Sequence, residues 1–401
     1  MRHLLVTNDF PPKIGGIQTY LWELWRRLPP ESFSVLTIDL PGAARFDAGQ
    51  GFPIERVPVP MLLPTPRLAR RIRHVADRTG SSLVVLDPLF PVGLLGPSLG
   101  LPYAVILHGA EVSVPGRLPG TRWAMAKVLR GAELVVTGGR WTEAEARRLA
   151  RTGALPYRRQ EQPVPPLPPF VDITPGVDHH RFRPLTPEER RTARVASGLP
   201  PDGRLVLSVG RLVPRKGMDT LIRAVARLAP SRSDLTVAIA GTGRQEGQLR
   251  ELVAATGAPV RLLGRVDGAH LPFLYGAADV FVQACRTRWA GLEQEGFGIV
   301  FLEAAACGVP SVAGRSGGAP EAVLHERTGL VVDRPGDPAA VASSLARLLD
   351  DEATRARLGR RARERVERFF SYDLLAARLA QVLEADAPRY AAGRFAHRRM
   401  G

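Results

Sequence analysis

Short apolar runs alternate along the chain with segments in which apolar residues recur at helical spacing. Such a run, bounded by turn residues, predicts a buried β-strand, and the segments between the runs predict helices. Strands are expected at residues 4–8, 35–39, 83–87, 104–108 and 134–137, then at 205–209, 236–240, 261–264, 280–283 and 310–313. Alternating strands and helices are typical of parallel sheets, so we predict an α/β protein with two doubly wound sheets.

The two series of strands are separated near residues 175–184, which predicts two domains facing each other across a cleft. We expect an N-terminal domain over residues 1–180 and a C-terminal domain over residues 181–370. The 401 residues, 45% of them hydrophobic, are enough for two cores. The proline-rich stretch 157–169 predicts a loop or linker.

The sequence from Glu295 to Ile299, Glu-Gly-Phe-Gly-Ile, places a carboxylate before a glycine turn, and Glu303 lies further along the apolar helix that begins there. Glycine lets backbone N–H groups approach a ligand, and a helix N-terminus favours an anion such as a diphosphate. Carboxylates accept hydrogen bonds from sugar hydroxyls. The pattern favours a sugar-nucleotide site, although two glutamates at a helix start are also typical of solvated or capping residues.

Two cations, Arg211 and Lys216, follow the strand at 205–209. Ligands of an open parallel sheet bind beyond the carboxyl ends of its strands, where these cations would neutralise a departing nucleoside diphosphate. The chain has 55 basic residues, and its only lysines are Lys13, Lys127 and Lys216, so a lysine here suggests a point charge for phosphate. An ordinary solvated loop is the alternative.

Two further candidates lie in the first half of the chain. Gly15 and Gly16 open a helix after the first strand, where backbone can approach a phosphate or a sugar, or where the chain simply turns tightly. His108 ends the strand at 104–108 and is either a site residue or a structural histidine.

Taken together, these residues resemble the retaining glycosyltransferases of the Glu-x7-Glu class, whose GT-B architecture consists of two Rossmann-like domains. Within that class, the chain is similar to the actinobacterial GDP-mannose-dependent mannosyltransferases of phosphatidylinositol mannosides. The similarity covers nearly the whole chain and is carried by residues 6–12, 15–18, 175–178, 211–217, 285–288, 295–304, 316–321 and 328–333. The resemblance also implies that the last helix, within residues 371–401, packs back on the N-terminal domain.

The resemblance implies a donor site for GDP-mannose. The donor diphosphate would be bound by cations and backbone amides of the second half: Arg211, Arg215, Lys216, Gly296, Phe297, Gly298 and Ile299. Glu295 would hold hydroxyls of the transferred hexose and Glu303 the ribose, while the backbone at Val266 would read the guanine base. Neither a cofactor nor a metal is expected, because the chain contains no Asp-x-Asp motif to chelate one.

For the first half, the resemblance places Gly15 and Gly16 against the diphosphate and the acceptor, and His108 at the hydroxymethyl group of the sugar. Gln18 would meet the inositol headgroup of a phosphatidylinositol mannoside. Retention of configuration would follow from attack by the acceptor hydroxyl on the face that the diphosphate leaves, since the resemblance provides no carboxylate nucleophile.

A net charge of +16 calls for an acidic partner, and part of that charge lies on one expected helix at residues 67–78. Its basic residues Arg67, Arg70, Arg71 and Arg73 surround an apolar face, and the apolar loop 61–64 precedes it. An anionic membrane surface is the partner that a lipid acceptor favours, although an ordinary solvated helix has the same pattern. Nucleic acid is not expected, because aromatic residues do not interleave with the basic ones.

We expect the protein in the cytoplasm, peripherally associated with the inner face of the membrane, since the sequence has neither a secretory nor a membrane-spanning segment. Cys285 and Cys307 are expected to be reduced and buried. An oxidoreductase is disfavoured, because residue 246 of the candidate fingerprint 241–246 is glutamate where a third glycine is required. A non-catalytic scaffold, or a transferase for another nucleotide hexose or a soluble glycan acceptor, are the remaining alternatives.

Overall fold

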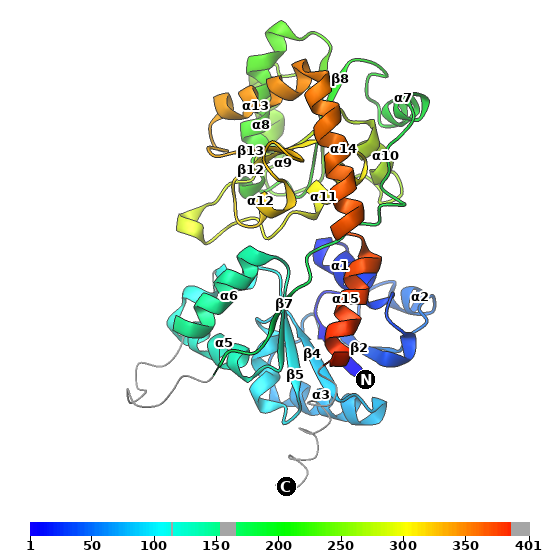
Figure 1. Cartoon of the computed structure of the whole chain (residues 1–401), viewed down its shortest axis with the longest axis vertical. Coiled ribbons are helices and arrows are strands. Elements are labelled where there is room, and N and C mark those ends of the chain that lie inside the picture. The colour runs from blue at the N-terminus through cyan, green and yellow to red at the C-terminus, as the bar shows by residue number, and fades with distance from the viewer. Residues whose placement is uncertain (114, 153–165, 386–401) are drawn as a thin grey trace. The chain divides into compact units, whose positions relative to one another are not determined.

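The computed structural model describes residues 1–113, 115–152 and 166–385, which form two compact units. Unit 1 comprises Met1–Pro175 and the chain from Tyr372 onward, and unit 2 comprises Gly176–Ser371. Each unit contains one sheet of parallel strands with helices around it (Figure 1).

Unit 1 has a seven-stranded sheet in the order β3-β2-β1-β4-β5-β6-β7. Its strands are β1 (His3–Thr7), β2 (Phe33–Ile38), β3 (Ile54–Val57), β4 (Leu83–Asp87), β5 (Tyr103–Leu107), β6 (Leu134–Thr137) and β7 (Phe170–Asp172). The first strand lies near the middle, where His3 pairs in register with Phe33 on one side and with Leu83 on the other.

Helices cover both faces of this sheet. They are α1 (Gly16–Trp25), α2 (Ala43–Asp47), α3 (Pro66–Thr79), α4 (Ala110–Ser113), α5 (Pro119–Gly131), α6 (Arg140–Thr152) and α15 (Tyr372–Ala385). Alternate residues of β1 point to opposite faces, so Leu4 and Val6 pack in the core under α3, α5 and α6, whereas Leu5 packs with α1 and α15. A strand buried on both faces is apolar throughout, which explains the uninterrupted runs in the sequence.

Unit 2 has a six-stranded parallel sheet in the order β10-β9-β8-β11-β12-β13. Its strands are β8 (Arg204–Val209), β9 (Leu235–Ala240), β10 (Val260–Gly264), β11 (Val280–Gln283), β12 (Ser311–Gly314) and β13 (Gly329–Val332). The helices are α7 (Pro187–Ala196), α8 (Met218–Leu228), α9 (Glu246–Thr256), α10 (Leu271–Ala277), α11 (Ile299–Ala306), α12 (Ala319–Ala322), α13 (Pro338–Asp350) and α14 (Glu352–Phe369). One core lies under α7, α10, α11 and α14, and the other under α8, α9 and α13.

The ten strands expected from the sequence are all present, and the fold class is confirmed. Three strands were not expected, namely β3, β7 and β13, and each of them is the outermost strand of its sheet. Helix α1 ends at Trp25, and the buried Leu28 lies in the turn that follows. Both cysteines are free and buried, as expected.

Within the described residues, no helix is both long enough and apolar enough to cross a membrane. Most of the expected linker 157–169 lies outside the residues that the structure describes, as does the end of the expected C-terminal segment after residue 385.

Candidate active site

Three of the expected donor-site residues meet beyond the carboxyl ends of β8 and β11. Lys216 Nζ lies 2.7 Å from Glu295 Oε2, and Arg215 Nη1 lies 3.1 Å from the same oxygen. The Lys216 ammonium also donates to Gln283 Oε1 at 3.0 Å. Residues from two distant parts of the sequence therefore form one charged cluster at this edge of the sheet.

The cluster is shielded from solvent, since Lys216 and Glu295 are each only 7% exposed. Burial is the largest influence on Glu295 and raises the pKa of its carboxyl group, but Lys216, Arg215 and Arg211 together outweigh it. The pKa of Glu295 is therefore below its ordinary value, and the carboxylate is ionised at neutral pH. Arg211 itself is exposed and acts on the carboxylate through its charge.

A tight turn places Lys216 beside Gln283. Gly217 has a φ of 70°, and a Cβ at this position would lie 2.0 Å from the carbonyl oxygen of Ala284, so only glycine fits where this loop packs on the end of β11. The Gln283 side chain is fixed in turn, because its Nε2 donates to the carbonyl of Val209 at 3.0 Å. Lys216 therefore extends from a rigid loop toward a rigid strand end.

A second turn, at residues 316–318, fixes the backbone of Glu295 through two hydrogen bonds. The backbone N–H of Glu295 donates to Ser316 Oγ at 3.2 Å, and the N–H of Gly318 donates to the Glu295 carbonyl at 3.0 Å. A Cβ on Gly317 would come within 2.0 Å of that carbonyl oxygen. Gly298, the residue before α11, has a φ of 92°, so the glycine turn leads into the helix as the sequence predicts.

Glu303 is held by a different element from Glu295. The hydroxyl group of Tyr275, on α10, donates to Glu303 Oε2 at 2.7 Å. Burial raises the pKa of Glu303, and this effect exceeds the opposing ones of the Tyr275 hydrogen bond and the Arg181 charge.

Val266 is half-buried and lines a cavity of about 620 Å³ together with residues of α7 and α10.

In unit 1, His108 is paired with a buried aspartate. Its Nε2 lies 2.6 Å from Asp87 Oδ1, and Thr7 Oγ1 donates to Asp87 Oδ2, also at 2.6 Å. Burial lowers the pKa of His108, but Asp87, Glu111 and Asp9 outweigh it and raise the pKa to about 9. The imidazole is thus protonated at neutral pH, and both ring nitrogens carry a proton.

The glycine loop after β1 is ordered by Asp9. Gln18 is buried, and its Nε2 donates to Asp9 Oδ1 at 2.5 Å, while Lys13 Nζ lies 2.6 Å from the same oxygen. A Cβ on Gly15 would lie 2.2 Å from the Gln18 amide oxygen, so Gly15 makes room for this side chain. Gly16 is the first residue of α1.

Helix α3 has its expected apolar face buried through Leu68, Ile72 and Val75. Arg67, Arg70 and Arg71 are exposed, and Arg73 is partly buried. Arg71 forms an ion pair, with its Nε 2.6 Å from Glu55 Oε1. Arg73 donates to the neutral carbonyl oxygen of Ser98 at 3.3 Å, so its positive charge is not compensated there.

Sequence reasoning missed four residues that fix these side chains: Asp87, Gln283, Tyr275 and Ser316. Asp87 and Gln283 are polar and lie at the carboxyl ends of strands 83–87 and 280–283, and that signal could have identified them. The partners of these two depend on which strands are neighbours, which the sequence pattern does not give.

The fold and the charged clusters at its strand ends define a glycosyltransferase of the GT-B type. The structure resembles that of Anabaena HepE in complex with UDP, with a TM-score of 0.78 and 20% identity over 96% of this chain and 100% of that one. It also resembles WaaG, a glycosyltransferase involved in lipopolysaccharide biosynthesis, with a TM-score of 0.66 and 19% identity over 95% of this chain and 99% of WaaG. Residues 189–365 match the glycosyl transferases group 1 family.

Sequence relatives narrow the class further. The chain is 36% identical to the GDP-mannose-dependent monoacylated α-(1-6)-phosphatidylinositol monomannoside mannosyltransferase of Corynebacterium glutamicum, over 96% of this chain and 98% of the relative. It is 37% identical to the corresponding enzyme of Mycobacterium tuberculosis over the same shares. The chain therefore belongs to the family of GDP-mannose-dependent phosphatidylinositol monomannoside mannosyltransferases, and its resemblance to these mannosyltransferases is confirmed. A D-inositol 3-phosphate glycosyltransferase of Salinispora tropica is 41% identical over 50% of this chain and 43% of its own length.

Proposed function

We propose that this protein transfers a mannosyl group from GDP-mannose to a phosphatidylinositol monomannoside with retention of configuration. The observation that carries this proposal is the buried cluster of Lys216, Arg215 and Glu295 beyond the carboxyl ends of β8 and β11. A cation and a carboxylate fixed together suit a ligand that combines an anionic diphosphate with a sugar rich in hydroxyl groups.

In this proposal the chemistry depends on stabilising the leaving group. Cleavage of the anomeric C–O bond leaves a GDP anion and an oxocarbenium-like sugar, and cations placed beforehand lower the barrier. An ammonium has three N–H donors, of which Glu295 and Gln283 receive two. The third is available for a phosphate oxygen, together with the guanidinium groups of Arg215 and Arg211.

The acceptor hydroxyl would attack on the face from which the diphosphate departs, with a departing phosphate oxygen taking its proton. Glu295 is already paired with two cations, which makes it a weak nucleophile and favours its role as an acceptor of sugar hydrogen bonds. Glu303 keeps one carboxylate oxygen for the ribose beside Tyr275, and the backbone near Val266 would read guanine.

Unit 1 would contribute contacts to the transferred sugar and to the acceptor. A protonated His108 held by Asp87 can donate from Nδ1 to the hydroxymethyl group of the transferred sugar. Gln18 would meet the inositol headgroup, and Gly15 and Gly16 would lie against the diphosphate and the acceptor.

A lipid acceptor requires access to the membrane, and we assign this contact to α3 and the loop before it, at the cytoplasmic face. Met61 and Leu63 are exposed by 50% and 52%, whereas Leu62 between them is buried. Two exposed apolar side chains beside a basic helix face match the pattern of a peripheral membrane contact.

The test is turnover of GDP-mannose and of UDP-glucose, each with phosphatidylinositol monomannoside as acceptor. We expect transfer from GDP-mannose alone, and the anomeric configuration of the product identifies retention. Transfer from UDP-glucose would instead support the alternative of another nucleotide hexose, and no transfer to this lipid from either donor would support a soluble glycan acceptor.

A further inference from the structure

A second charged region of unit 2 lies at the edge of the sheet opposite the candidate active site. Arg204 is the first residue of β8, and Asp279 and Pro310 directly precede β11 and β12. All strands of this sheet are parallel, so their amino ends share one edge, whereas Lys216 follows the carboxyl end of β8. The two regions are therefore on opposite edges of the same sheet.

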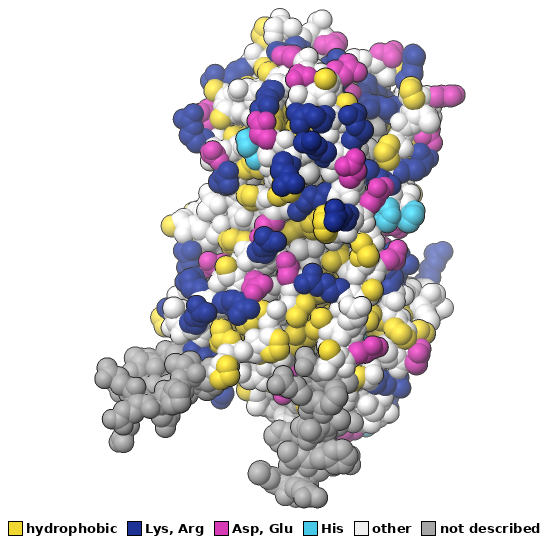
Figure 2. Space-filling view, in the orientation of Figure 1, with side chains coloured by type: hydrophobic (Ala, Val, Ile, Leu, Met, Phe, Trp, Pro, Cys, Tyr) yellow, Lys and Arg dark blue, Asp and Glu magenta, His cyan; other side chains and the backbone are white. Residues whose placement is uncertain are grey.

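This edge borders a cavity of about 790 Å³ that is rich in arginine. Seven arginines and three carboxylates line it, and Arg363 has a further carboxylate partner, Glu367, outside the wall. Cations therefore exceed carboxylates by three even when Glu367 is included. Basic side chains also gather over α14 on the face that Figure 2 shows, and α14 contributes to the wall.

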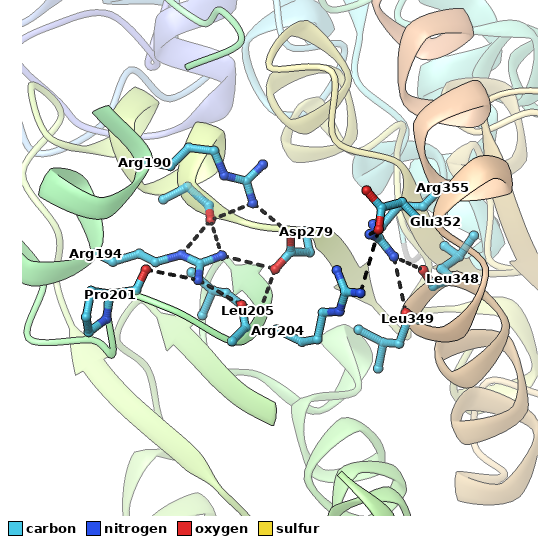
Figure 3. Close-up of polar contacts among 12 residues, drawn as sticks. Arg190, Arg194, Pro201, Arg204, Leu205, Asp279, Leu348, Leu349, Glu352 and Arg355 are labelled. Atoms are coloured by element: carbon cyan, nitrogen blue, oxygen red, sulfur yellow. Dashed lines mark hydrogen bonds and ion pairs between the residues drawn. The ribbon is translucent and has the colours of Figure 1, made fainter. Parts of the chain in front are cut away.

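Two of these arginines are structural. Arg194 is 4% exposed and donates to the carbonyl oxygens of Ala277 and Gly203 as well as to Asp279 (Figure 3). Arg355 is 8% exposed and donates to the carbonyl oxygen of Leu348 at 2.9 Å. Their hydrogen-bonding capacity is used within the fold, since Arg194 ties α7 to the residues before β8 and β11, and Arg355 ties α14 to the end of α13.

Arg204 and Arg360 differ from these two because their guanidinium groups have donors to spare. Arg204 Nη2 lies 3.9 Å from Glu352 Oε2, which is too long for a hydrogen bond, and Glu352 is itself 78% exposed and shared with Arg355. Figure 3 shows Arg204 between Asp279 on one side and Glu352 on the other. Arg360 is exposed, and its side chain has no ion pair or hydrogen bond with any other described residue.

The nearby acidic groups do not neutralise this excess. The Asp279 carboxylate is fully occupied, since it receives Arg190 at 2.7 Å, Arg194 at 3.0 Å and the N–H of Leu205 at 2.7 Å. Burial lowers the pKa of Arg355, and the positive charges of Arg204 and Arg190 lower it further. Nearby positive charge disfavours the charged form of a guanidinium, so this effect agrees with an excess of cations around the cavity.

We propose that this cavity binds the phosphate group of an anionic ligand, with Arg204 and Arg360 as its main contacts. Guanidinium groups present N–H donors in a fork that matches a phosphate, and a volume of this size accommodates a ligand larger than the phosphate itself. The phosphate belongs to either a free metabolite or a lipid headgroup. The inference is independent of the proposed transferase function, because the cavity lies at the other edge of the sheet.

The experiment titrates inorganic phosphate into the full-length protein by calorimetry, at an ionic strength held constant with sodium chloride. We expect saturable binding that the double variant Arg204→Gln, Arg360→Gln weakens at least tenfold. A matched pair, Arg223→Gln with Arg361→Gln, removes two exposed arginines of unit 2 outside the cavity and should leave the affinity unchanged. Lys216→Ala should also leave it unchanged, because that residue belongs to the candidate active site.

A second arm uses phosphatidylcholine vesicles with and without phosphatidylinositol. Binding of the phosphatidylinositol vesicles that depends on Arg204 and Arg360, with weak binding of free phosphate, would support the proposal and identify a lipid headgroup as the source. The proposal is overturned if the double variant and the matched pair behave alike in both arms, or if Lys216→Ala alone abolishes phosphate binding. Thermal melts of all variants confirm that each is folded.

Discussion

Charge at the carboxyl ends of the strands is held in buried pairs, Lys216 with Glu295 in unit 2 and His108 with Asp87 in unit 1. A lone buried charge is costly, whereas a paired and hydrogen-bonded one is tolerated. Each pair leaves one donor of its cation available, so both sites can add a ligand without rebuilding the pair. This arrangement is the preorganisation that stabilisation of a leaving group requires.

Lys216→Ala tests the role of the ammonium at the diphosphate. We expect mannosyl transfer to fall by about 100-fold or more, because loss of one preorganised charge typically has an effect of that size. Unfolding should become easier by about 2–3 kcal/mol, since Glu295 keeps Arg215 but loses its nearer partner. The assays are initial-rate kinetics and chemical denaturation.

Lys127→Ala is the matched control, because Lys127 is exposed on α5. It should leave both turnover and stability nearly unchanged. If Lys216→Ala retained normal turnover in a folded protein, the assignment of the donor site to this cluster would be wrong.

The His108–Asp87 pair predicts a specific pH dependence of stability. The folded pKa of about 9 lies above the ordinary value of 6.5, so the contribution of His108 to stability is complete below pH 6.5 and is lost as the pH rises through about 9. The difference corresponds to about 3 kcal/mol. NMR titration of the imidazole and denaturation at several pH values measure it.

Asp87→Asn should lower the pKa of His108 and flatten the stability profile between pH 6.5 and 9, because the largest influence that raises this pKa is removed. His74, an exposed histidine of α3, serves as an internal reference in the same spectra. An unchanged titration of His108 in the variant would contradict the pairing.

At the level of the elements, the start of α11 depends on a left-handed residue. Gly298→Ala should destabilise the protein by about 1–3 kcal/mol and reduce turnover, because φ is 92° and the new Cβ would lie 2.6 Å from the Phe301 ring. Gly247→Ala in α9 is the matched control, since a Cβ there meets nothing within 4 Å. It should be neutral or slightly stabilising. Equal effects of the two substitutions on thermal unfolding would refute this account.

The strands illustrate what sequence can and cannot predict. Strands inside each sheet are apolar on both faces and were all expected, whereas β3 and β7 are only partly buried and lack a continuous apolar run. Strand β13 is buried but has only four residues and begins with glycine. Partial burial and short length therefore weaken the signal by which a strand is recognised, and of the four edge strands only β10 was expected.

The individual residues of the candidate site show the same limit. The glycine turn at Glu295 and the cations after β8 carry local signals, so the sequence predicted both. Their partners Gln283 and Asp87 become partners only because β11 lies beside β8 and β4 beside β5. Strand order is a property of the whole sheet, and the alternation of apolar runs does not contain it.

For the whole molecule, the net charge of +16 and the basic face of α3 make different predictions about membranes. If total charge governs vesicle binding, any three arginines are equivalent. If α3 with Met61 and Leu63 makes the contact, position matters. Replacing Arg70, Arg71 and Arg73 with glutamate should weaken binding to anionic vesicles at least tenfold, as expected from about 1 kcal/mol for each basic residue near the surface.

The control replaces Arg223, Arg227 and Arg361, all exposed in unit 2, with glutamate. Each of the three substitutions lowers the net charge by two, so both triple variants change it from +16 to +10. Vesicle cosedimentation at low and physiological salt separates the two explanations, since exposed charges more than a Debye length from the surface are screened at physiological salt. We expect the control triple to bind like the unmodified protein at physiological salt. Equal weakening of both triples there would assign membrane attraction to total charge and remove α3 from the proposed contact.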